Sequence, residues 1–365
     1  MIDLLCNFNI SRNDAKQRKV LLYVLRGPGG PGGKFLKLFV SGVYIPHIEG
    51  LLRKLRKYYF LVKSIFLTIF FAFSLSSCNI GTPKTYRFTI GISYQNLQNE
   101  FILNIQDAVR KRAKELNVKL IEVEGQGKAE NQISQVENFL AMDVDAIILN
   151  PFDKYGSAPV VSIAKREGKP IVVLNAIVVN VDQADAYVGS DDSEAGRIAA
   201  TYICKLLNGK GNIAIIRGPN GHSAEIQRTS GIAEVLKNFP GIKVPFDQSA
   251  NWDRAQGLNL MENWLGTGKE INAVIAQNDE MALGAYKAIE AAGKQKDILV
   301  IGIDAISDAL KAVKEGRLCA TVFQDARGQG SIAIDIAVKL LQGEKVNHSN
   351  YIPFQLITKH NIAGF

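Results

Sequence analysis

The sequence has few of the residues that cross-link small secreted folds or bind metal ions, with four cysteines and four histidines in 365 residues. The cysteine spacing suggests no disulfide framework, the histidines are scattered, and no Asp-x-Asp-x-Asp-Gly calcium loop occurs. Cys204 falls in a helix-like stretch and Cys319 in a strand-like one, so we expect both to be small buried apolar residues. We therefore expect neither a metal site nor a dependence on disulfides.

The motifs that bind phosphates and nucleotide cofactors are also missing. The first apolar stretch, Phe88–Tyr94, offers one glycine where a dinucleotide-binding turn needs three. The glycine-rich run before Lys34 is not a phosphate-binding loop, because Pro28 stands at its first glycine position and Phe35 follows the lysine. No nucleophile elbow or Cys-His-Asp constellation occurs. We therefore expect no cofactor and no enzymatic activity.

Positive charge is concentrated at the front of the chain. Residues 1–77 hold 12 Lys and Arg against 3 Asp and Glu, whereas the remainder holds 31 against 32. The net charge of +8 therefore reflects the first segment, and it predicts neither nucleic acid nor another acidic partner.

The segment that ends at Cys78 has the pattern of an export signal. Basic residues between Arg53 and Lys63 precede the apolar run Ile65–Leu75, which has the length of a signal-peptide core and is too short to span a bilayer comfortably. The next residues, Ser76-Ser77-Cys78, complete a stretch that resembles the lipobox of bacterial lipoproteins. In that class the signal is cut before the cysteine, which then takes acyl chains.

These patterns divide the front of the chain into three parts. We expect residues 51–77 to be a signal peptide with a lipobox, Cys78 to carry the lipid anchor, and residues 78–85 to be a tether. An ordinary secretory signal with an unmodified cysteine is the alternative. Residues 1–50 fit no export signal, and no Met lies between Met1 and Met142, so we interpret residues 1–50 as an over-extended gene model.

From Tyr86 onward, short apolar strands alternate with amphipathic helices, as in parallel sheets with helices on both faces. Two runs of five units predict an α/β protein of two doubly wound lobes joined by a hinge, the first from 86–190 plus 325–353 and the second from 191–324 plus 354–365. The expected strands are Phe88–Tyr94, Lys119–Val123, Ala146–Leu149, Pro170–Leu174, Ala186–Val188, Asn212–Ile216, Lys243–Phe246, Ala273–Ala276, Leu299–Ile303 and Ala320–Phe323. Helices are expected, for example, at Ile105–Leu116, Glu130–Leu140, Glu194–Leu207, Arg254–Leu265 and Ala282–Ala292.

Polar side chains follow many of these strands at their carboxyl ends, where an open α/β sheet binds its ligand. Each alone is explained as a helix cap or a turn former. Together they recur at equivalent strand ends in both lobes, which favours a binding site. The residues are Asn150, Asn175, Ser190, Asn278, Asp304 and Gln324.

The chain from Tyr86 to Ile362 resembles the ribose- and galactose-binding proteins, which are type I periplasmic binding proteins of ABC importers. The resemblance is carried by Ile148-Leu-Asn-Pro151, Ala273–Gly284, Ile301-Gly-Ile-Asp304 and Gly343-Glu-Lys-Val346. It implies that a sugar ring lies between Phe101 and Trp252. It also implies hydrogen bonds to the sugar from Asn99, Asn175, Arg228, Asn278, Asp304 and Gln324.

The chain departs from the ribose type at several of these positions. Asn175-Ala176 replaces an Asp-Arg pair, and Ile102 and Ile303 stand at aromatic positions. His222 resembles the galactose and glucose type, and a tryptophan at 252 offers a large stacking face. We therefore expect a hexose or similar polyol rather than ribose.

The resemblance implies a monomeric binding lipoprotein that closes around its solute and delivers it to a membrane permease. Such a protein would face the periplasm or the cell exterior. A binder that presents a solute or autoinducer to a chemoreceptor is the alternative. The core of a LacI-type regulator is less favoured, because a helix-turn-helix would be needed where the export signal stands.

Overall fold

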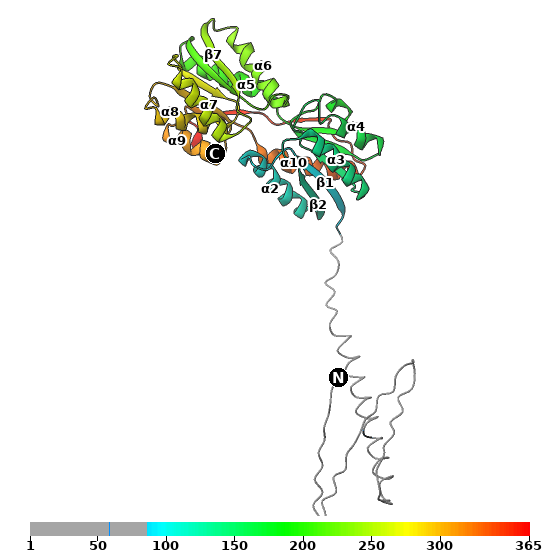
Figure 1. Cartoon of the computed structure of the whole chain (residues 1–365). Helices are drawn as coiled ribbons and strands as arrows, with labels where there is room; N and C mark the ends of the chain where they lie inside the picture. The colour runs from blue at the N-terminus through cyan, green and yellow to red at the C-terminus, as the bar shows by residue number, and fades with distance from the viewer. Residues whose placement is uncertain (1–57, 59–85) are drawn as a thin grey trace, which may run out of the picture. The chain divides into compact units, whose positions relative to one another are not determined.

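The computed structural model describes Tyr58 and residues 86–365. The predictions for residues 1–50, the signal peptide at 51–77, the lipid at Cys78 and the tether at 78–85 lie outside these described residues. Within them, no helix is both long enough and apolar enough to cross a membrane. Residues 84–365 form one compact unit, which contains two lobes (Figure 1).

The first lobe is built on a six-stranded sheet in which every pair of neighbours is parallel. From edge to edge its strands are β2 (Val118–Glu124), β1 (Phe88–Tyr94), β3 (Ala146–Leu149), β4 (Ile171–Asn175), β5 (Ala186–Gly189) and β11 (Ser349–Tyr351). Its helices are α2 (Glu100–Glu115), α3 (Ala129–Ala141), α4 (Pro159–Arg166) and α10 (Ala326–Leu341). The strand order reverses at β1, which makes the β1/β3 boundary a switch point for ligand binding.

The second lobe repeats this plan. Its sheet runs β7 (Gly241–Ser249), β6 (Lys210–Arg217), β8 (Ala273–Ala276), β9 (Leu299–Asp304), β10 (Ala320–Phe323) and β12 (Gln355–Ile357), with β12 alone antiparallel to its neighbour. Its helices are α5 (Asp192–Leu206), α6 (Ser223–Leu236), α7 (Arg254–Gly266), α8 (Asp279–Ala291) and α9 (Ser307–Glu315). Two short 3₁₀ turns, Val181–Gln183 and Ile362–Gly364, complete the described chain. The two-lobe doubly wound fold is therefore confirmed.

Each sheet is buried on both faces because helices cover both of them, and successive side chains of a strand enter the two layers in turn. In β3, Ile147 and Leu149 pack with the residues of α3 and α4, whereas Ile148 joins the cluster that contains α2 and α10. All four β3 residues are completely buried. These layers hold the strand ends, and thus the polar residues that follow them, in fixed positions.

The chain crosses between the lobes three times. The crossings follow β5, β10 and β11, so that α10 and β11 return to the first lobe before β12 joins the second sheet. After the second crossing, helix α10 packs in the first lobe, where an ion pair joins its Asp335 Oδ1 to Arg112 Nε of α2 at 2.7 Å. The three crossings are short, as expected of a hinge between two compact lobes.

Helices α5 and α6 approach each other closely at two glycines. A Cβ at Gly196 would lie 2.2 Å from the Arg228 carbonyl oxygen, and one at Gly231 would lie 2.1 Å from that of Ser193. Only a residue without a side chain fits at such contacts. This packing sets the position of Arg228, which projects from α6 into the region between the lobes.

The two cysteines within the described residues are free, as predicted. Cys204 is completely buried, whereas Cys319 is half-buried and donates its thiol to the Val300 carbonyl at 3.1 Å. Burial raises the pKa of the Cys319 thiol to about 12. A thiol held protonated in this way is a poor nucleophile.

Candidate functional site

A pocket lies between the carboxyl ends of the two sheets. Its free space is about 310 Å³, part of which is open to solvent. Its lining comes from both lobes and comprises Gln95, Asn99, Phe101, Ile102, Asn175, His222, Ala224, Arg228, Trp252, Asn278, Asp304 and Gln324. Nine of these residues are sequence-predicted site residues, which the structure brings together in one cavity.

The first lobe contributes residues around the start of α2 and the end of β4. Asn99 caps α2, because its Oδ1 accepts the Phe101 N–H at 2.8 Å, and the cap turns Phe101 and Ile102 into the pocket. Asn175 ends β4 with a φ of 67°, and its Nδ2 donates to Gln329 Oε1 of α10 at 3.1 Å. The left-handed backbone of Asn175 aims its amide toward the cleft instead of continuing the strand.

Arg228 is the central cation of the second lobe. Its guanidinium donates to Asp192 Oδ1 at 2.8 Å, to Gln324 Oε1 at 3.1 Å and to the Gln277 carbonyl. Both Arg228 and Asp192 are almost completely buried, so their charges compensate each other within the site. Burial raises the pKa of Asp192, and the neighbouring Arg228 opposes that rise.

Asp304 differs from Asp192 because its carboxylate has no close partner. No hydrogen-bond donor among the described residues reaches it, and Arg228 Nη1 lies 3.9 Å from Oδ1. Its residue exposure is 6 %. Burial raises the pKa of Asp304 well above the usual range, although Arg228 lowers it in part. A buried carboxylate of this kind accepts hydrogen bonds from a ligand at a large gain.

Two side-chain amides of the second lobe and its crossing segment also line the pocket. Gln324 follows β10 at a crossing between lobes, and its Nε2 is buried with no hydrogen-bond partner. Asn278 caps α8 through its Oδ1, which accepts the Met281 N–H at 2.9 Å, and its Nδ2 donates to the Trp252 carbonyl at 3.3 Å. Asn278 therefore has both the capping role and the pocket position expected from the sequence.

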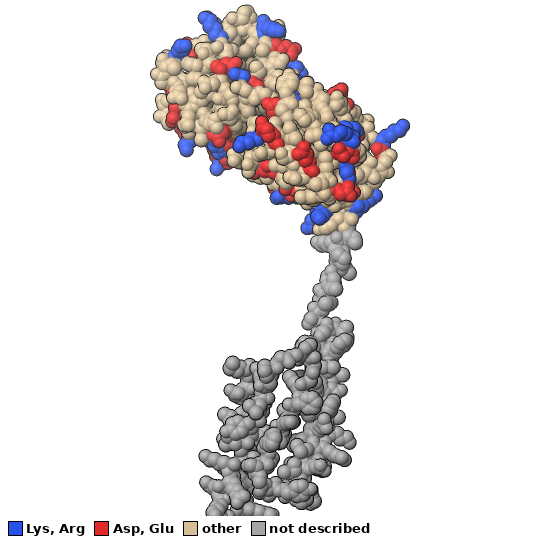
Figure 2. Space-filling model, turned by 45° about the vertical axis from the view of Figure 1, so that its right-hand side comes forward, with Lys and Arg blue, Asp and Glu red and all other residues tan. Residues whose placement is uncertain are grey.

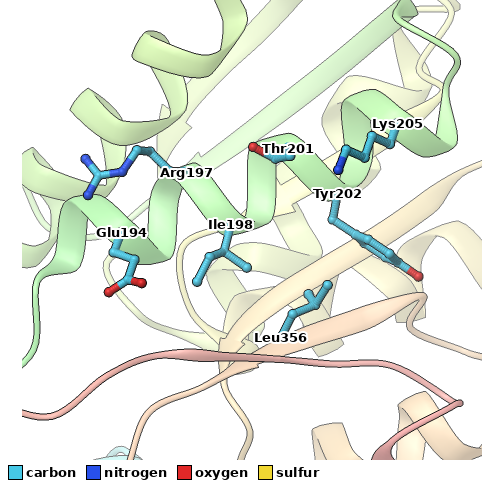
Figure 3. A pocket seen from close by; sticks show the side chains of 7 residues that line it. All are labelled: Glu194, Arg197, Ile198, Thr201, Tyr202, Lys205 and Leu356. Atoms are coloured by element: carbon cyan, nitrogen blue, oxygen red, sulfur yellow. The ribbon is translucent and has the colours of Figure 1, made fainter.

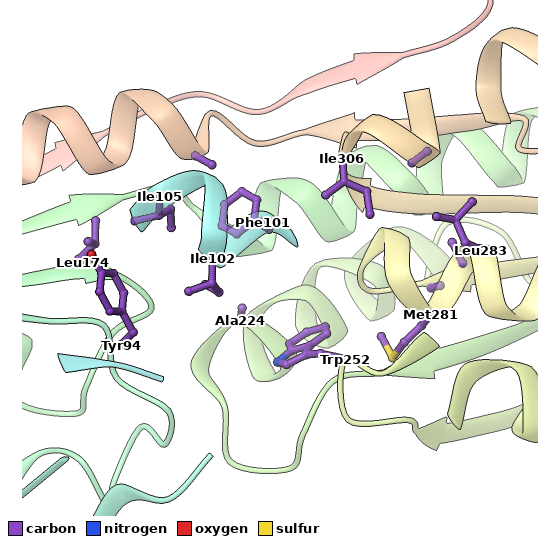
Figure 4. Close-up of a cluster of buried hydrophobic side chains, with 14 of the residues drawn as sticks. Tyr94, Phe101, Ile102, Ile105, Leu174, Ala224, Trp252, Met281, Leu283 and Ile306 are labelled. Atoms are coloured by element: carbon purple, nitrogen blue, oxygen red, sulfur yellow. The ribbon is translucent and has the colours of Figure 1, made fainter. Parts of the chain in front are cut away.

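Aromatic rings from the two lobes enter the cavity from different sides. Figure 4 shows Phe101 and Ile102 on α2 and Trp252 on the loop before α7, with Ala224 between them. Trp252 has a φ of 63°, and a Cβ at Gly218 would lie 2.1 Å from its ring. The glycine thus leaves room for the indole. Apolar rings placed in this way pack against the C–H faces of a sugar or a cyclic polyol.

His222 closes one side of the pocket across the lobe boundary. Its Nδ1 accepts the Ala224 N–H at 3.2 Å, so the ring proton is on Nε2, which lies 2.7 Å from Gln95 Oε1 of the first lobe. Burial, and secondarily the charge of Arg228, lower the pKa of His222 to about 3. The imidazole is therefore neutral and donates to Gln95.

Further hydrogen bonds join the lobes around this pocket. The Lys154 N–H donates to the Gly221 carbonyl at 3.0 Å, and the Ile177 N–H donates to Ser223 Oγ at 2.9 Å. Elsewhere the Ser307 N–H donates to Glu100 Oε1 at 3.0 Å. The lobes are thus closed on each other.

Two of the sequence-predicted residues do not line the pocket. Asn150 is completely buried behind it, where its amide accepts the Gln95 N–H at 3.2 Å and donates to the Leu174 carbonyl at 3.2 Å. Ser190 lies at the first crossing, and its Oγ accepts from Gln329 Nε2 at 3.3 Å. Both residues therefore support neighbouring segments of the site.

Sequence reasoning missed Gln95 and Asp192 as parts of the site. Gln95 follows β1 directly. It could therefore have been found as a polar residue at the carboxyl end of a strand, like the other strand-end residues. Asp192 is the first residue of α5 and is matched to Arg228 only through the packing of α5 on α6.

A separate groove lies on the second lobe alone, between α5 and β12 (Figure 3). Ile198, Tyr202 and Leu356 supply its apolar lining, and Arg197 at its end is paired with Asp191 and Glu234. A ligand there would not bridge the lobes. Within the described residues, no group of three or more His, Cys, Asp or Glu side chains could hold a metal ion. On the face in Figure 2, positive and negative side chains are interspersed.

Comparison with known proteins extends over most of the chain. The model of the periplasmic binding protein domain family matches residues 90–345. A protein of Rhizobium meliloti named as a rhizopine-binding protein is 40% identical over 302 residues, which cover 81% of this chain and 98% of that protein. The ribose import binding protein of Bacillus subtilis is 35% identical over 305 residues, with 81% and 98% covered.

Solved structures agree with these relatives. An ABC transporter solute-binding protein from Bacillus halodurans, with bound myo-inositol, is 43% identical with a TM-score of 0.74, and the match covers 78% of this chain and 98% of that one. Relatives of this kind are binding components of transporters and not enzymes. The chain therefore belongs to the type I periplasmic binding proteins that bind sugars and related solutes outside the cytoplasm for ABC importers.

Proposed function

We propose that this protein captures a neutral polyol with a six-membered ring, either a cyclitol such as myo-inositol or a hexopyranose, and delivers it to an ABC permease. The observation that carries the proposal is the pair of unsatisfied polar groups in the closed pocket. The Asp304 carboxylate has no donor within reach and the Gln324 amide nitrogen has no acceptor. Ring hydroxyls satisfy both needs, because a hydroxyl donates and accepts.

The ring size follows from the apolar parts of the pocket. Trp252 presents a two-ring face, and Phe101 and Ile102 enter from the opposite lobe. An extended aromatic face suits the C–H groups of a six-membered ring. The bound myo-inositol in the 43% identical structure supports this choice, and a myo-inositol-binding protein of Caulobacter is a further solved relative with a TM-score of 0.73.

Closure is the step that couples binding to delivery. Asn99, Phe101 and Asn175 belong to the first lobe, whereas Arg228, Trp252 and Asp304 belong to the second. A ligand that bonds both sets stabilises the closed form over the open one, and the permease would distinguish the two. A dissociation constant in the micromolar range, about −8 kcal/mol, is ordinary for a protein that must also release its solute.

A thermal-shift screen of the compact unit, residues 84–365, tests this proposal. Pentoses, hexoses, cyclitols and nucleosides are compared at concentrations far above micromolar. A ligand at 100 times its dissociation constant adds about 2.7 kcal/mol of stability. Stabilisation by a cyclitol or hexose supports the proposal, and a response to nucleosides or pentoses alone contradicts it.

The membrane attachment is proposed from the sequence alone. Cys78 would carry the acyl chains that hold a monomeric protein beside its permease, and two or more chains are needed for stable anchoring. Cys78→Ala should release the protein into the soluble fraction of cells and abolish labelling by radioactive palmitate. Retention of the variant in the membrane fraction would show that Cys78 is not the anchor.

A sensory role is the second candidate. The fructose-binding periplasmic domain of a hybrid two-component system is a solved relative, with 26% identity and a TM-score of 0.73. Uptake of labelled ligand separates the two roles: deletion of this protein abolishes uptake if it serves an importer, and leaves uptake intact if it serves a receptor.

A further inference from the structure

A second, larger cavity adjoins the pocket in the same cleft. Its free space is about 890 Å³, compared with about 310 Å³ for the pocket that contains Asp304, and part of each is open to solvent. Both lobes line it, with Asn96, Glu124, Gln126 and Phe152 from the first lobe and Pro219 and Asn251 from the second among the lining residues. We call the pocket around Asp304 the inner pocket and this cavity the outer chamber.

The outer chamber lies directly beyond one wall of the inner pocket. Asn96 and Asn251 in the chamber are the chain neighbours of Gln95 and Trp252 in the pocket. The Phe152 ring makes an edge contact with His222, with centroids 6.4 Å apart. From these contacts we place the side chains of Gln95, His222 and Trp252 in the wall between the two cavities.

This wall is held by one side-chain hydrogen bond across the lobes. Gln95 Oε1 and His222 Nε2 lie 2.7 Å apart, and His222 meets Trp252 at 5.5 Å between ring centroids. The side chains of this wall can rotate without a change of the fold, whereas a wall made of backbone could not open in this way. A substituent on the bound ring can thus pass between Gln95 and His222 when it replaces their mutual bond with bonds to its own oxygens.

The chamber has the chemistry of a carbohydrate subsite. Asn96 and Gln126 supply amides, and Asn96 Oδ1 is buried with no hydrogen-bond partner. The amide of Asn251 is already engaged, because its Nδ2 donates to Gln256 Oε1 at 2.8 Å and its Oδ1 accepts from Ser249 Oγ at 3.1 Å. The carboxylate of Glu124 is already engaged, because its Oε1 accepts the Leu97 N–H at 2.9 Å. Amides that donate and accept match sugar hydroxyls, and an aromatic ring matches the C–H face of a sugar.

One glycine leaves part of this aromatic ring uncovered. Gly127 lies beside Phe152 with a φ of 66°, and a Cβ there would be 3.5 Å from the ring. The left-handed backbone favours glycine, so no side chain covers that part of Phe152. The chamber thus offers both the polar and the apolar contacts that a second sugar ring needs.

We propose that the outer chamber is a second carbohydrate subsite, so that the protein also binds polyols or hexoses carrying an O-linked sugar. The first ring occupies the inner pocket and the second ring the chamber, with the glycosidic link between Gln95 and His222. This inference rests on the proposed function of the inner pocket. Because both lobes line both cavities, the longer ligand still stabilises the closed form.

Calorimetric titration of the protein with matched pairs of compounds tests the inference. The pairs are myo-inositol with its 1-O-α-galactoside, and D-glucose with maltose. We expect at least one glycoside to bind with a dissociation constant within tenfold of that of its parent ring. Binding of the parent rings with more than a hundredfold loss for both glycosides overturns the second subsite alone. If no ring binds at all, the proposed function fails and the inference falls with it.

A variant in the chamber gives a second, independent readout. Asn96→Leu removes the unpaired amide oxygen, and we expect the ratio of glycoside to parent dissociation constants to rise at least fivefold. Asn180→Leu is the matched control, because Asn180 also has a buried unpaired Oδ1 but does not line either cavity. Its ratio should stay within twofold of that of the unmodified protein. An unchanged ratio in Asn96→Leu contradicts the subsite.

Discussion

His222 Nε2 donates across the lobe boundary to Gln95 Oε1 at 2.7 Å, and the residue is buried when the lobes are closed. The bond to Gln95 needs a proton on Nε2, and Nδ1 carries none because it accepts the Ala224 N–H. Burial of the ring in the closed form disfavours the imidazolium. Closure therefore selects the neutral form of His222.

Ligand affinity is predicted to fall in acid because of this selection. In the open cleft we expect His222 to titrate near its ordinary pKa of about 6.5, whereas in the closed form its pKa is about 3. At His222 the closed form binds fewer protons, so the contribution of this residue to closure is fully present above pH 6.5 and declines below it, by roughly tenfold for each pH unit. The raised pKa of Asp304 acts in the opposite direction. Calorimetric dissociation constants at pH 7.5 and pH 5.0 measure the effect.

His222→Asn is the control for this prediction. An Asn side chain can still cap α6 with its oxygen, which takes the place of Nδ1, but it does not titrate. All other titrating groups of the site, including Asp304 and Asp192, are shared by both proteins. The pH dependence should be much weaker in the variant, and an equal dependence in both proteins would assign it to another group.

Asp304→Asn is predicted to weaken ligand binding at least tenfold, about 1.4 kcal/mol or more. The carboxylate accepts from two hydroxyls more strongly than an amide oxygen can. The same change replaces a buried ionisable group with a neutral amide. The melting temperature of the ligand-free protein should therefore not fall. Asp308→Asn is the control, since that carboxylate is exposed on α9 and pairs with Arg254. Unchanged affinity in Asp304→Asn would remove Asp304 from the site.

Trp252 is predicted to report ligand binding by fluorescence. The protein has two tryptophans, and Trp264 is stacked on Phe246 at 5.2 Å, outside the pocket. Trp264→Phe should keep the ligand-dependent change in emission and Trp252→Phe should lose it. Trp252→Ala should in addition remove most of the affinity while the protein stays folded. A signal that follows Trp264 would place the indole of Trp252 away from the ligand.

Gly231→Ala is predicted to destabilise the protein by about 1–3 kcal/mol, because the added methyl group would overpack the contact between α5 and α6. A Cβ at Gly231 would lie 2.1 Å from the Ser193 carbonyl oxygen. Since α6 carries Arg228, ligand affinity should fall as well. Gly266→Ala is the matched control at the end of α7, where nothing lies within 4 Å of an added Cβ. Urea unfolding of both variants measures their free energies of unfolding, and equal values would contradict the close packing.

The alternation of strands and helices could be predicted from the sequence, since strands such as Ala146–Leu149 are buried on both faces and read as unbroken apolar runs. Strands β11 and β12 were not predicted, because each has only three residues, too few to show a pattern. Helix α2 begins at Glu100 rather than at Ile105, because the Asn99 cap sets its start. Local signals thus predict elements better than they predict their ends.

The candidate site was predicted only in part for a related reason. A strand end gives the edge at which a residue lies but not the direction of its side chain. Asp304 and Gln324 face the pocket, whereas Asn150 turns toward the backbone at Gln95 and Leu174. The contact between His222 and Gln95 depends on how two lobes meet, which no local pattern encodes. The binding roles of the lining residues remain predictions.

Calorimetric titration of residues 84–365 with myo-inositol, D-glucose and D-ribose decides whether the protein prefers a six-membered ring. We expect a micromolar dissociation constant for a six-membered ring and binding at least tenfold weaker for ribose. Tighter binding of ribose than of either six-membered ring, or no binding of any of the three, would contradict this expectation.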